Sequence, residues 1–68
     1  MNNERINLML HHFIQGKKVA DANLREFKFS DEEITQVEKS GYIEFIETTP
    51  WGDRRFTITT KGLAFRDD

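Results

Sequence analysis

The sequence contains no cysteine, a single proline and no long apolar run. Without cysteine the chain has neither disulfide bonds nor thiolate chemistry, which fits a reducing compartment, and we expect a cytoplasmic protein. No apolar stretch approaches the roughly 20 residues that a membrane-spanning helix needs. Residues 1–5 have neither the basic start nor the apolar run of a signal peptide. We therefore expect no membrane association.

Motifs of catalysis and cofactor binding are also scarce. There is no glycine-rich phosphate loop. His11 and His12 are the only histidines, and because adjacent helical positions point about 100° apart, they cannot chelate one metal ion as an i, i+4 pair does. The acidic residues 31–33 are explained by helix capping and the helix dipole. We expect no enzymatic activity, cofactor, metal ion or small-molecule substrate.

Length and charge limit the number of domains and the kinds of partner that the chain can have. The 68 residues suffice for one domain, residues 1–68, with a small core. The net charge is −2, whereas a free-standing nucleic-acid-binding domain is more often strongly basic. Residues 31–47 carry six acidic side chains and one basic one, and residues 16–28 carry four basic and two acidic ones. The acidity is therefore concentrated in one segment.

The N-terminal half is patterned for short helices. Residues 3–15 form the first, with Asn2 or Asn3 as its cap and Gly16 as the left-handed residue just past its end. Its apolar stripe follows the i, i+3, i+4, i+7 spacing and consists of Ile6, Met9, Leu10 and Phe13. The opposite face carries Leu8, His11 and His12. One side of this helix should therefore be buried, with one apolar residue facing out.

Two further helices are expected before residue 41. The second begins near Asp21, whose carboxylate can accept from the free amides of the first turn, and its buried side consists of Ala20, Leu24 and Phe27. The third begins after Ser30, which forms a capping box with Glu33. Its buried side consists of Ile34 and Val37, and Gly41 ends it.

After Gly41 the pattern changes to that of a β-hairpin. Residues 42–47 are rich in β-branched and aromatic side chains, which are typical of a strand. Residues 48–53 contain Pro and Gly, which are typical of a turn. Residues 55–59 alternate polar and apolar side chains, as a half-buried strand does. Residues 17–19 can add a short third strand. Together with the helices, this order predicts an α+β fold.

The hairpin is followed by a closing helical turn over residues 61–65, capped by Thr59 or Thr60. Three helices, a hairpin and a short helix follow one another as in a winged helix-turn-helix. Residues 37–44 (Val-Glu-Lys-Ser-Gly-Tyr-Ile-Glu) resemble the passage between recognition helix and wing in bacterial winged-helix regulators. Residues 51–62 resemble the wing of the MarR and PadR families, with its Asp-Arg-Arg-like tip, and the Thr-x-Lys-Gly element that ends them is the most specific match.

The resemblance implies a three-helix core with a β-hairpin wing. It also implies a small bacterial or phage DNA-binding protein, acting in transcription regulation, whose third helix enters the major groove of double-stranded DNA. Those families are longer, and the additional helices that form their dimers are missing from this pattern. Effector binding and obligate dimerisation are therefore not implied for this chain.

The expected third helix supplies the first candidate contacts. With Ile34, Val37 and Gly41 toward the core, the 3.6-residue period puts Glu32, Gln36 and Lys39 outermost, flanked by Thr35 and Ser40. Gln36 carries the bidentate amide that reads adenine, and Lys39 suits guanine or a phosphate. The alternative is an ordinary solvated helix face.

The hairpin turn supplies the second set. Arg54 and Arg55 can reach phosphates or a minor groove, and Asp53 can brace one of them. Trp51, at the tip, is expected outside the core and is a further candidate contact. Alternatively, the two arginines form weak cross-strand ion pairs with Glu44 or Glu47. Around the second helix, weaker phosphate contacts are available from Lys17, Lys18, Arg25 and Lys28.

Two functions remain open from the sequence. The first is binding of double-stranded DNA by the third helix and the wing. The second is a protein-interaction module, in which the acidic third helix docks on a basic partner or the Leu8, His11 and His12 face mediates a homodimer. Only the first uses the candidate contacts described above.

Overall fold

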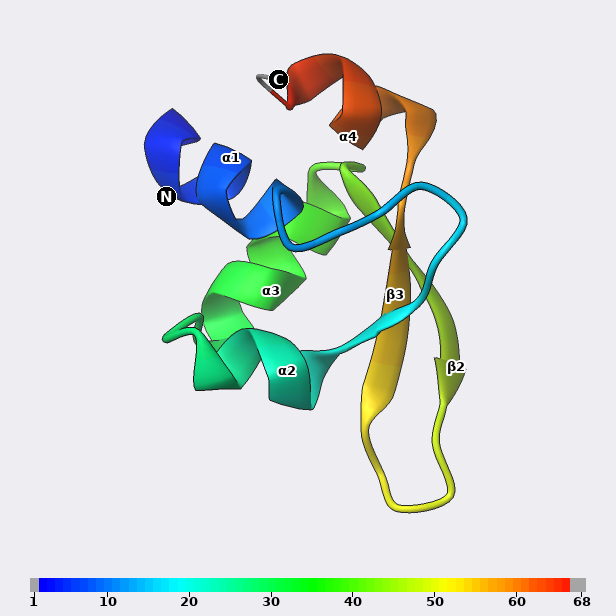
Figure 1. Ribbon diagram of the computed structural model, residues 1–68. Helices are drawn as coiled ribbons and strands as arrows, with labels where there is room; N and C mark the ends of the chain where they lie inside the picture. The colour runs from blue at the N-terminus through cyan, green and yellow to red at the C-terminus, as the bar shows by residue number, and fades with distance from the viewer. Residues whose placement is uncertain (1, 67–68) are drawn as a thin grey trace.

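Four helices and a three-stranded antiparallel sheet make up the computed structural model, which describes residues 2–66 (Figure 1). The elements are α1 (Asn3–Leu10), β1 (Val19–Ala20), α2 (Asp21–Glu26), α3 (Asp31–Lys39), β2 (Ile43–Thr48), β3 (Arg54–Ile58) and α4 (Thr60–Phe65). The α+β class expected from the sequence is thus confirmed. Of the single domain expected over residues 1–68, Met1, Asp67 and Asp68 lie outside the described residues.

Helix α1 begins as the sequence predicts but ends earlier. The Asn2 side chain accepts a hydrogen bond from the Arg5 amide at 2.8 Å, so Asn2 is the cap. The helix ends at Leu10 rather than at residue 15. The Leu10 carbonyl accepts from the Phe13 amide at 3.0 Å, and the Arg66 guanidinium donates to the carbonyls of Leu10 and Phe13 at 3.4 and 2.8 Å.

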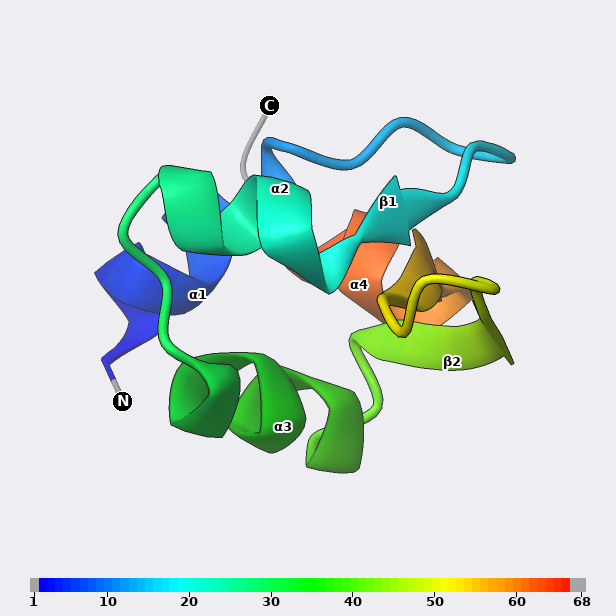
Figure 2. The same ribbon diagram turned by 90° about the horizontal axis from the view of Figure 1, so that it is seen from below.

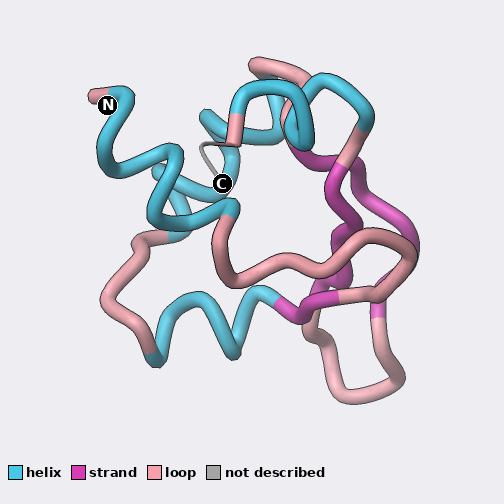
Figure 3. The backbone as a smooth tube through the Cα atoms, turned by 45° about the horizontal axis from the view of Figure 1, so that its top comes forward, coloured by secondary structure: helices cyan, strands magenta, loops and turns pink. Residues whose placement is uncertain are grey.

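The segment between α1 and β1 is irregular (Figure 3). Gly16 has the expected positive φ, +80°. It belongs, however, to a separate turn in which the Lys17 amide donates to the Ile14 carbonyl at 2.9 Å. The prediction that Gly16 ends the first helix is therefore wrong, although its left-handed backbone was foreseen.

Helix α2 buries a different phenylalanine from the expected one. Phe27 is 55% exposed, whereas Phe29 is 2% exposed. The helix ends at Glu26, and Lys28 adopts a positive φ of 72°, which reverses the chain and brings the Phe29 amide to the Leu24 carbonyl at 3.2 Å. The reversal takes Phe29 into the core and leaves Phe27 outside, where its ring stacks on His12 at 4.2 Å.

Helix α3 is built as its sequence predicts. Ser30 accepts from the Glu33 amide at 3.1 Å, and the Glu33 carboxylate accepts from the Ser30 amide at 3.0 Å. The same carboxylate binds the Arg5 guanidinium at 2.9 Å, which ties α3 to α1. The left-handed residue after the helix is Gly41, with φ +86°, as expected.

Strand β3 is the centre of the sheet, between β1 and β2. A short third strand is present, but it consists of Val19–Ala20 rather than residues 17–19, with Val19 opposite Phe56. Strands β2 and β3 form the expected hairpin, with bounds shifted by one residue from the sequence prediction and a register irregularity between Phe45 and Glu47. Such a bulge bends and twists a hairpin. The β2–β3 hairpin extends beyond the helices (Figure 1).

One hydrophobic core lies between the helices and the sheet. Its buried members are Ile6, Met9, Leu10, Phe13, Leu24, Phe29, Ile34, Val37, Ile43, Phe56 and Ile58. Each helix from α1 to α3 and both hairpin strands contribute to it. Helix α4 closes one end, capped by the Thr59 side chain, which accepts from the Gly62 amide at 3.0 Å. Within residues 2–66, no helix is long and apolar enough to cross a membrane.

Candidate functional site

The outer face of α3 is not covered by another element of the described chain (Figure 2). The positions expected to be outermost, Glu32, Gln36 and Lys39, are exposed, and the flanking Thr35 and Ser40 are half-buried. A hollow on this face is lined by Asp31, Glu32, Thr35, Gln36 and Lys39. The Ser40 carbonyl is occupied by the Lys61 ammonium at 2.7 Å. The helix therefore offers an amide, a hydroxyl and an ammonium group together with two carboxylates.

The turn of the β2–β3 hairpin is tightly hydrogen-bonded. The Thr49 amide donates to the Asp53 carbonyl at 2.7 Å, and the Asp53 amide donates to the Thr49 hydroxyl at 2.9 Å. Gly52, with φ +95°, completes the reversal. Trp51 is 70% exposed, in agreement with its predicted place outside the core. Its indole N–H donates to Asp53 Oδ2 at 2.9 Å.

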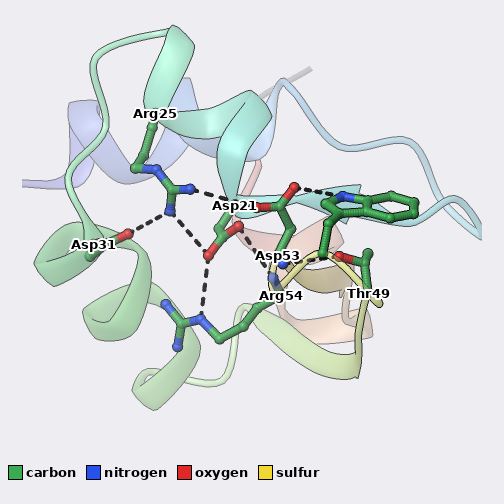
Figure 4. Close-up of polar contacts among 7 residues, drawn as sticks. Asp21, Arg25, Asp31, Thr49, Asp53 and Arg54 are labelled. Atoms are coloured by element: carbon green, nitrogen blue, oxygen red, sulfur yellow. Dashed lines mark hydrogen bonds and ion pairs between the residues drawn. The ribbon is translucent and has the colours of Figure 1, made fainter.

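Asp21 links α2 to the base of this hairpin (Figure 4). Its Oδ1 accepts from the Arg54 amide at 3.2 Å and its Oδ2 lies 3.5 Å from Arg54 Nε, while Arg25 Nη1 lies 3.1 Å from Oδ2. The residue is 5% exposed, and it does not cap α2, whose N-cap is Ala20, with no side-chain cap hydrogen bond. The predicted capping role of Asp21 is therefore wrong, since the carboxylate turns toward the hairpin.

Arg25 is surrounded by carboxylates. Besides Asp21, its guanidinium lies 2.9 Å from Asp31 and 3.8 Å from Asp53 (Figure 4). The expectation that Asp53 braces Arg54 or Arg55 is wrong, because this carboxylate faces Arg25 and the Trp51 indole. Arg25, Asp21 and Asp53 thus connect α2, the start of α3 and the hairpin turn through one network.

The second hairpin arginine pairs within its own sheet. Arg55 Nη1 lies 3.0 Å from Glu47 Oε2, and the Lys18 ammonium lies 3.5 Å from the same oxygen. This is the cross-strand alternative named for the arginines, and for Arg55 it is confirmed. For Arg54 it is wrong, because the partner is Asp21 on α2.

Three of the candidate cations remain outside these networks. The ion pairs formed within residues 2–66 do not include Lys17, Lys28 or Lys39. The candidate residues therefore divide into two groups. Lys39, with Gln36, Thr35 and Ser40, lies on α3, whereas Arg25, Arg54 and Arg55 reach a ligand only by sharing or leaving a carboxylate.

Sequence reasoning missed the linking role of Asp21. The sequence gave little indication of this role, because an aspartate at the start of a short helix is also typical of an N-cap. The i, i+4 spacing of Asp21 and Arg25 was visible, but the contact with Arg54 spans 33 positions. No local pattern indicates a contact of that separation.

The two structural carboxylates have pKa values below their ordinary range. Burial alone would raise the pKa of Asp21, but hydrogen bonds from the Arg25 side chain and the Arg54 backbone outweigh it. The pKa of Glu33 is lowered chiefly by the hydrogen bond from the Arg5 side chain, with help from the Ser30 amide. In both cases the surroundings favour the charged form.

Acid is expected to destabilise the fold through these two groups. A carboxyl group with a lowered pKa in the folded state binds fewer protons than in the unfolded chain, whose values are near 3.8 for Asp21 and 4.5 for Glu33. Its stabilising contribution is complete above the unfolded pKa and is lost as the pH falls through the folded pKa. The urea midpoint should thus hold from neutral pH down to these values and fall below them.

The matched control is the variant that combines Asp21→Asn with Glu33→Gln. It should be less stable than the wild type at neutral pH and should lose less stability on acidification. If both proteins lose stability equally as the pH falls below 3.8, other carboxyl groups carry the acid sensitivity.

A second surface feature lies on α1. Leu8 is 51% exposed, as predicted, and a hollow beside it is lined by Asn2, Glu4, Arg5, Asn7, Leu8 and His11. His12, expected on the same outward face, instead packs on Phe27 and Phe29. Within residues 2–66, no group of three or more His, Asp or Glu side chains is placed to hold a metal ion.

Comparison with known proteins adds no relative. No protein-family model matches the chain, and neither the curated proteins nor the solved structures give a match.

Proposed function

We propose that this chain is a winged-helix domain that binds double-stranded DNA, with α3 in the major groove and the β2–β3 hairpin against the backbone. The observation that carries the proposal is the outer face of α3, which is lined by polar side chains and is not covered by another element beside the β2–β3 hairpin (Figure 2). The order α1, β1, α2, α3, β2, β3, α4 is that of a winged helix, and the wing-like sequence of residues 51–62 supports a regulator of the MarR and PadR type.

The dimensions of α3 suit this role. An α-helix with its side chains is about 10–12 Å in diameter, which a B-DNA major groove about 12 Å wide admits. Gln36 then faces a base edge and Lys39 a guanine or phosphate. Asp31, at the start of the helix, has its charge offset by Arg25 at 2.9 Å. Glu32 remains unfavourable near phosphates, so we expect weak binding that falls steeply with salt.

Replacement of Lys39 tests the proposal. Lys39→Ala should weaken binding of a fluorescently labelled mixed-sequence duplex by several-fold at low salt and reduce the logarithmic salt slope by about 1. The measurement is fluorescence anisotropy over a series of salt concentrations. Lys17→Ala is the comparison, because it removes the same charge from a weaker candidate contact in the exposed loop before β1 and should cost less affinity. Equal losses in the two variants would show that α3 is not the principal contact.

A second candidate is a protein-interaction module. It is favoured by the ion pairs that occupy Arg25, Arg54 and Arg55, and by the exposed Leu8 beside a hollow on α1. The acidic end of α3 would then dock on a basic partner, or the α1 face would form a homodimer. Light scattering of the free domain and a chemical-shift titration with a short duplex separate the two. Shifts on Gln36, Lys39 and the hairpin favour DNA, and a dimer joined through α1 favours the alternative.

A further inference from the structure

The tip of the hairpin holds a large aromatic side chain in solvent. Trp51 is 70% exposed, and it is the only tryptophan of the chain. An indole that is 70% exposed gains little for folding, since the hydrophobic effect rewards only surface removed from water. Its exposed face is therefore accessible to a ligand.

The indole is held in place. Its N–H donates to Asp53 Oδ2 at 2.9 Å. The Asp53 backbone is in turn fixed by two hydrogen bonds with Thr49, one with its amide at 2.7 Å and one with its hydroxyl at 2.9 Å. Thr49 is itself 6% exposed. The other oxygen of Asp53 lies 3.8 Å from Arg25, which connects the tip to α2. A ligand that binds this ring meets a partly ordered side chain and so loses less entropy to order it.

The indole of Trp51 offers a ligand its aromatic face. The only hydrogen-bond donor of the indole is already used within the turn, so a partner that needs this donor is disfavoured. A nucleobase needs only the face, because stacking does not depend on the identity of its hydrogen-bonding edge. Arg54 and Arg25, at the base of the tip, are paired with Asp21 and Asp53, so they reach the phosphates that flank such a base by sharing these carboxylates.

We infer that Trp51 is a stacking residue for a nucleobase that is unpaired or lies at a flexible step of the bound DNA. The inference rests on the proposed function and specifies its ligand. The hairpin then does more than contact the backbone, because the ring needs a base whose face is open. Proteins that insert apolar side chains between base steps unstack them and bend the duplex.

Intrinsic fluorescence reports directly on this contact. Three probes are used at low salt: a fully paired duplex, the same duplex with one extra unpaired thymine, and the single strand. Stacking should quench the Trp51 emission as anisotropy of the labelled DNA reaches saturation, most strongly for the probe with the unpaired base. Equal quenching by the fully paired duplex would assign the contact to a flexible paired step.

Substitution supplies the second readout. Trp51→Leu should weaken binding of the bulged duplex about 10-fold and that of the fully paired duplex less, while Trp51→Phe retains most of the affinity. Phe45→Leu, which removes another half-exposed aromatic ring of the hairpin, is the matched control and should have little effect. Thermal unfolding checks that each variant is folded. We expect the Trp51 variants to fold, because the side chain is exposed.

The two proposals fail in different ways. If the DNA is bound with Lys39-dependent affinity but the Trp51 emission stays unchanged at saturation, the stacking role is refuted and DNA binding stands. If no probe gives an anisotropy change, the proposed function itself is refuted, and with it the stacking role.

Discussion

Gly62→Ala should destabilise the fold by about 3 kcal/mol or more. A Cβ added at residue 62 would overlap the carbonyl oxygen of Tyr42 and lie 2.8 Å from Ile58 Cγ1. The Tyr42 carbonyl cannot simply move away, because it accepts from the Thr59 amide at 3.0 Å. Accommodating the methyl group therefore displaces α4 from the end of the sheet. For a chain of 68 residues, the free energy of unfolding is about 3–10 kcal/mol. The substitution should therefore remove about a third of it at the upper end of this range and all of it at the lower end.

Helix propensity predicts the opposite sign. Gly62 lies within α4, where replacement by alanine would by itself stabilise the helix by about 1 kcal/mol. Gly16→Ala is the control: no atom lies within 4 Å of the added Cβ, and only the φ of +80° opposes it, at a cost of about 1–2 kcal/mol. Urea unfolding followed by circular dichroism compares the two. A stabilised Gly62→Ala would disprove the close approach of α4 to residue 42.

Phe29→Ala should cost about 3–5 kcal/mol, whereas Phe27→Ala should cost less than about 1 kcal/mol. The two variants have identical composition and differ only in which ring is removed. Phe29 is 2% exposed and Phe27 is 55% exposed. Removing Phe29 leaves a cavity beneath α1 and takes away the ring that lies 4.5 Å from the Arg5 guanidinium. Removing Phe27 takes away a stacking contact with His12 at 4.2 Å.

The pair of variants distinguishes the core from its periphery in one experiment. Free energies of unfolding come from urea titrations at neutral pH, and Phe29→Leu serves where Phe29→Ala is too unstable to measure, with an expected loss of about 1 kcal/mol. Equal losses for Phe27→Ala and Phe29→Ala, or a larger loss for Phe27→Ala, would contradict the chain reversal at Lys28.

Helix starts and the order of elements were predictable because their signals are local. Asn2, Ser30 and Thr59 cap their helices, and each precedes its helix in the way that side-chain capping requires. The change from a 3.6-residue to a two-residue apolar period after Gly41 likewise predicted the hairpin. The exposed positions of α3 followed from the same period, since two buried residues fix the helix rotation.

Where a contact joins distant segments, the local sequence pattern gave no prediction of it or a wrong one. Phe27 fits the stripe of α2 better than Phe29 does, and only the positive φ of Lys28 reverses the choice. Just past the end of α1, the Phe13 carbonyl accepts from Arg66, which lies 53 positions away. Nothing near residue 13 in the sequence predicts this partner.

The sequence by itself determined the α+β class, the caps of α1, α3 and α4, the hairpin and the polar face of α3, because each depends on periodicity or on hydrogen bonds between near neighbours. Only the tertiary structure decided which charges are available to a ligand. Arg25, Arg54 and Arg55 look alike in the sequence, and all three find carboxylates in the fold. Ion pairing depends on which side chains the packed core brings within a few ångströms, and that is a property of the whole chain.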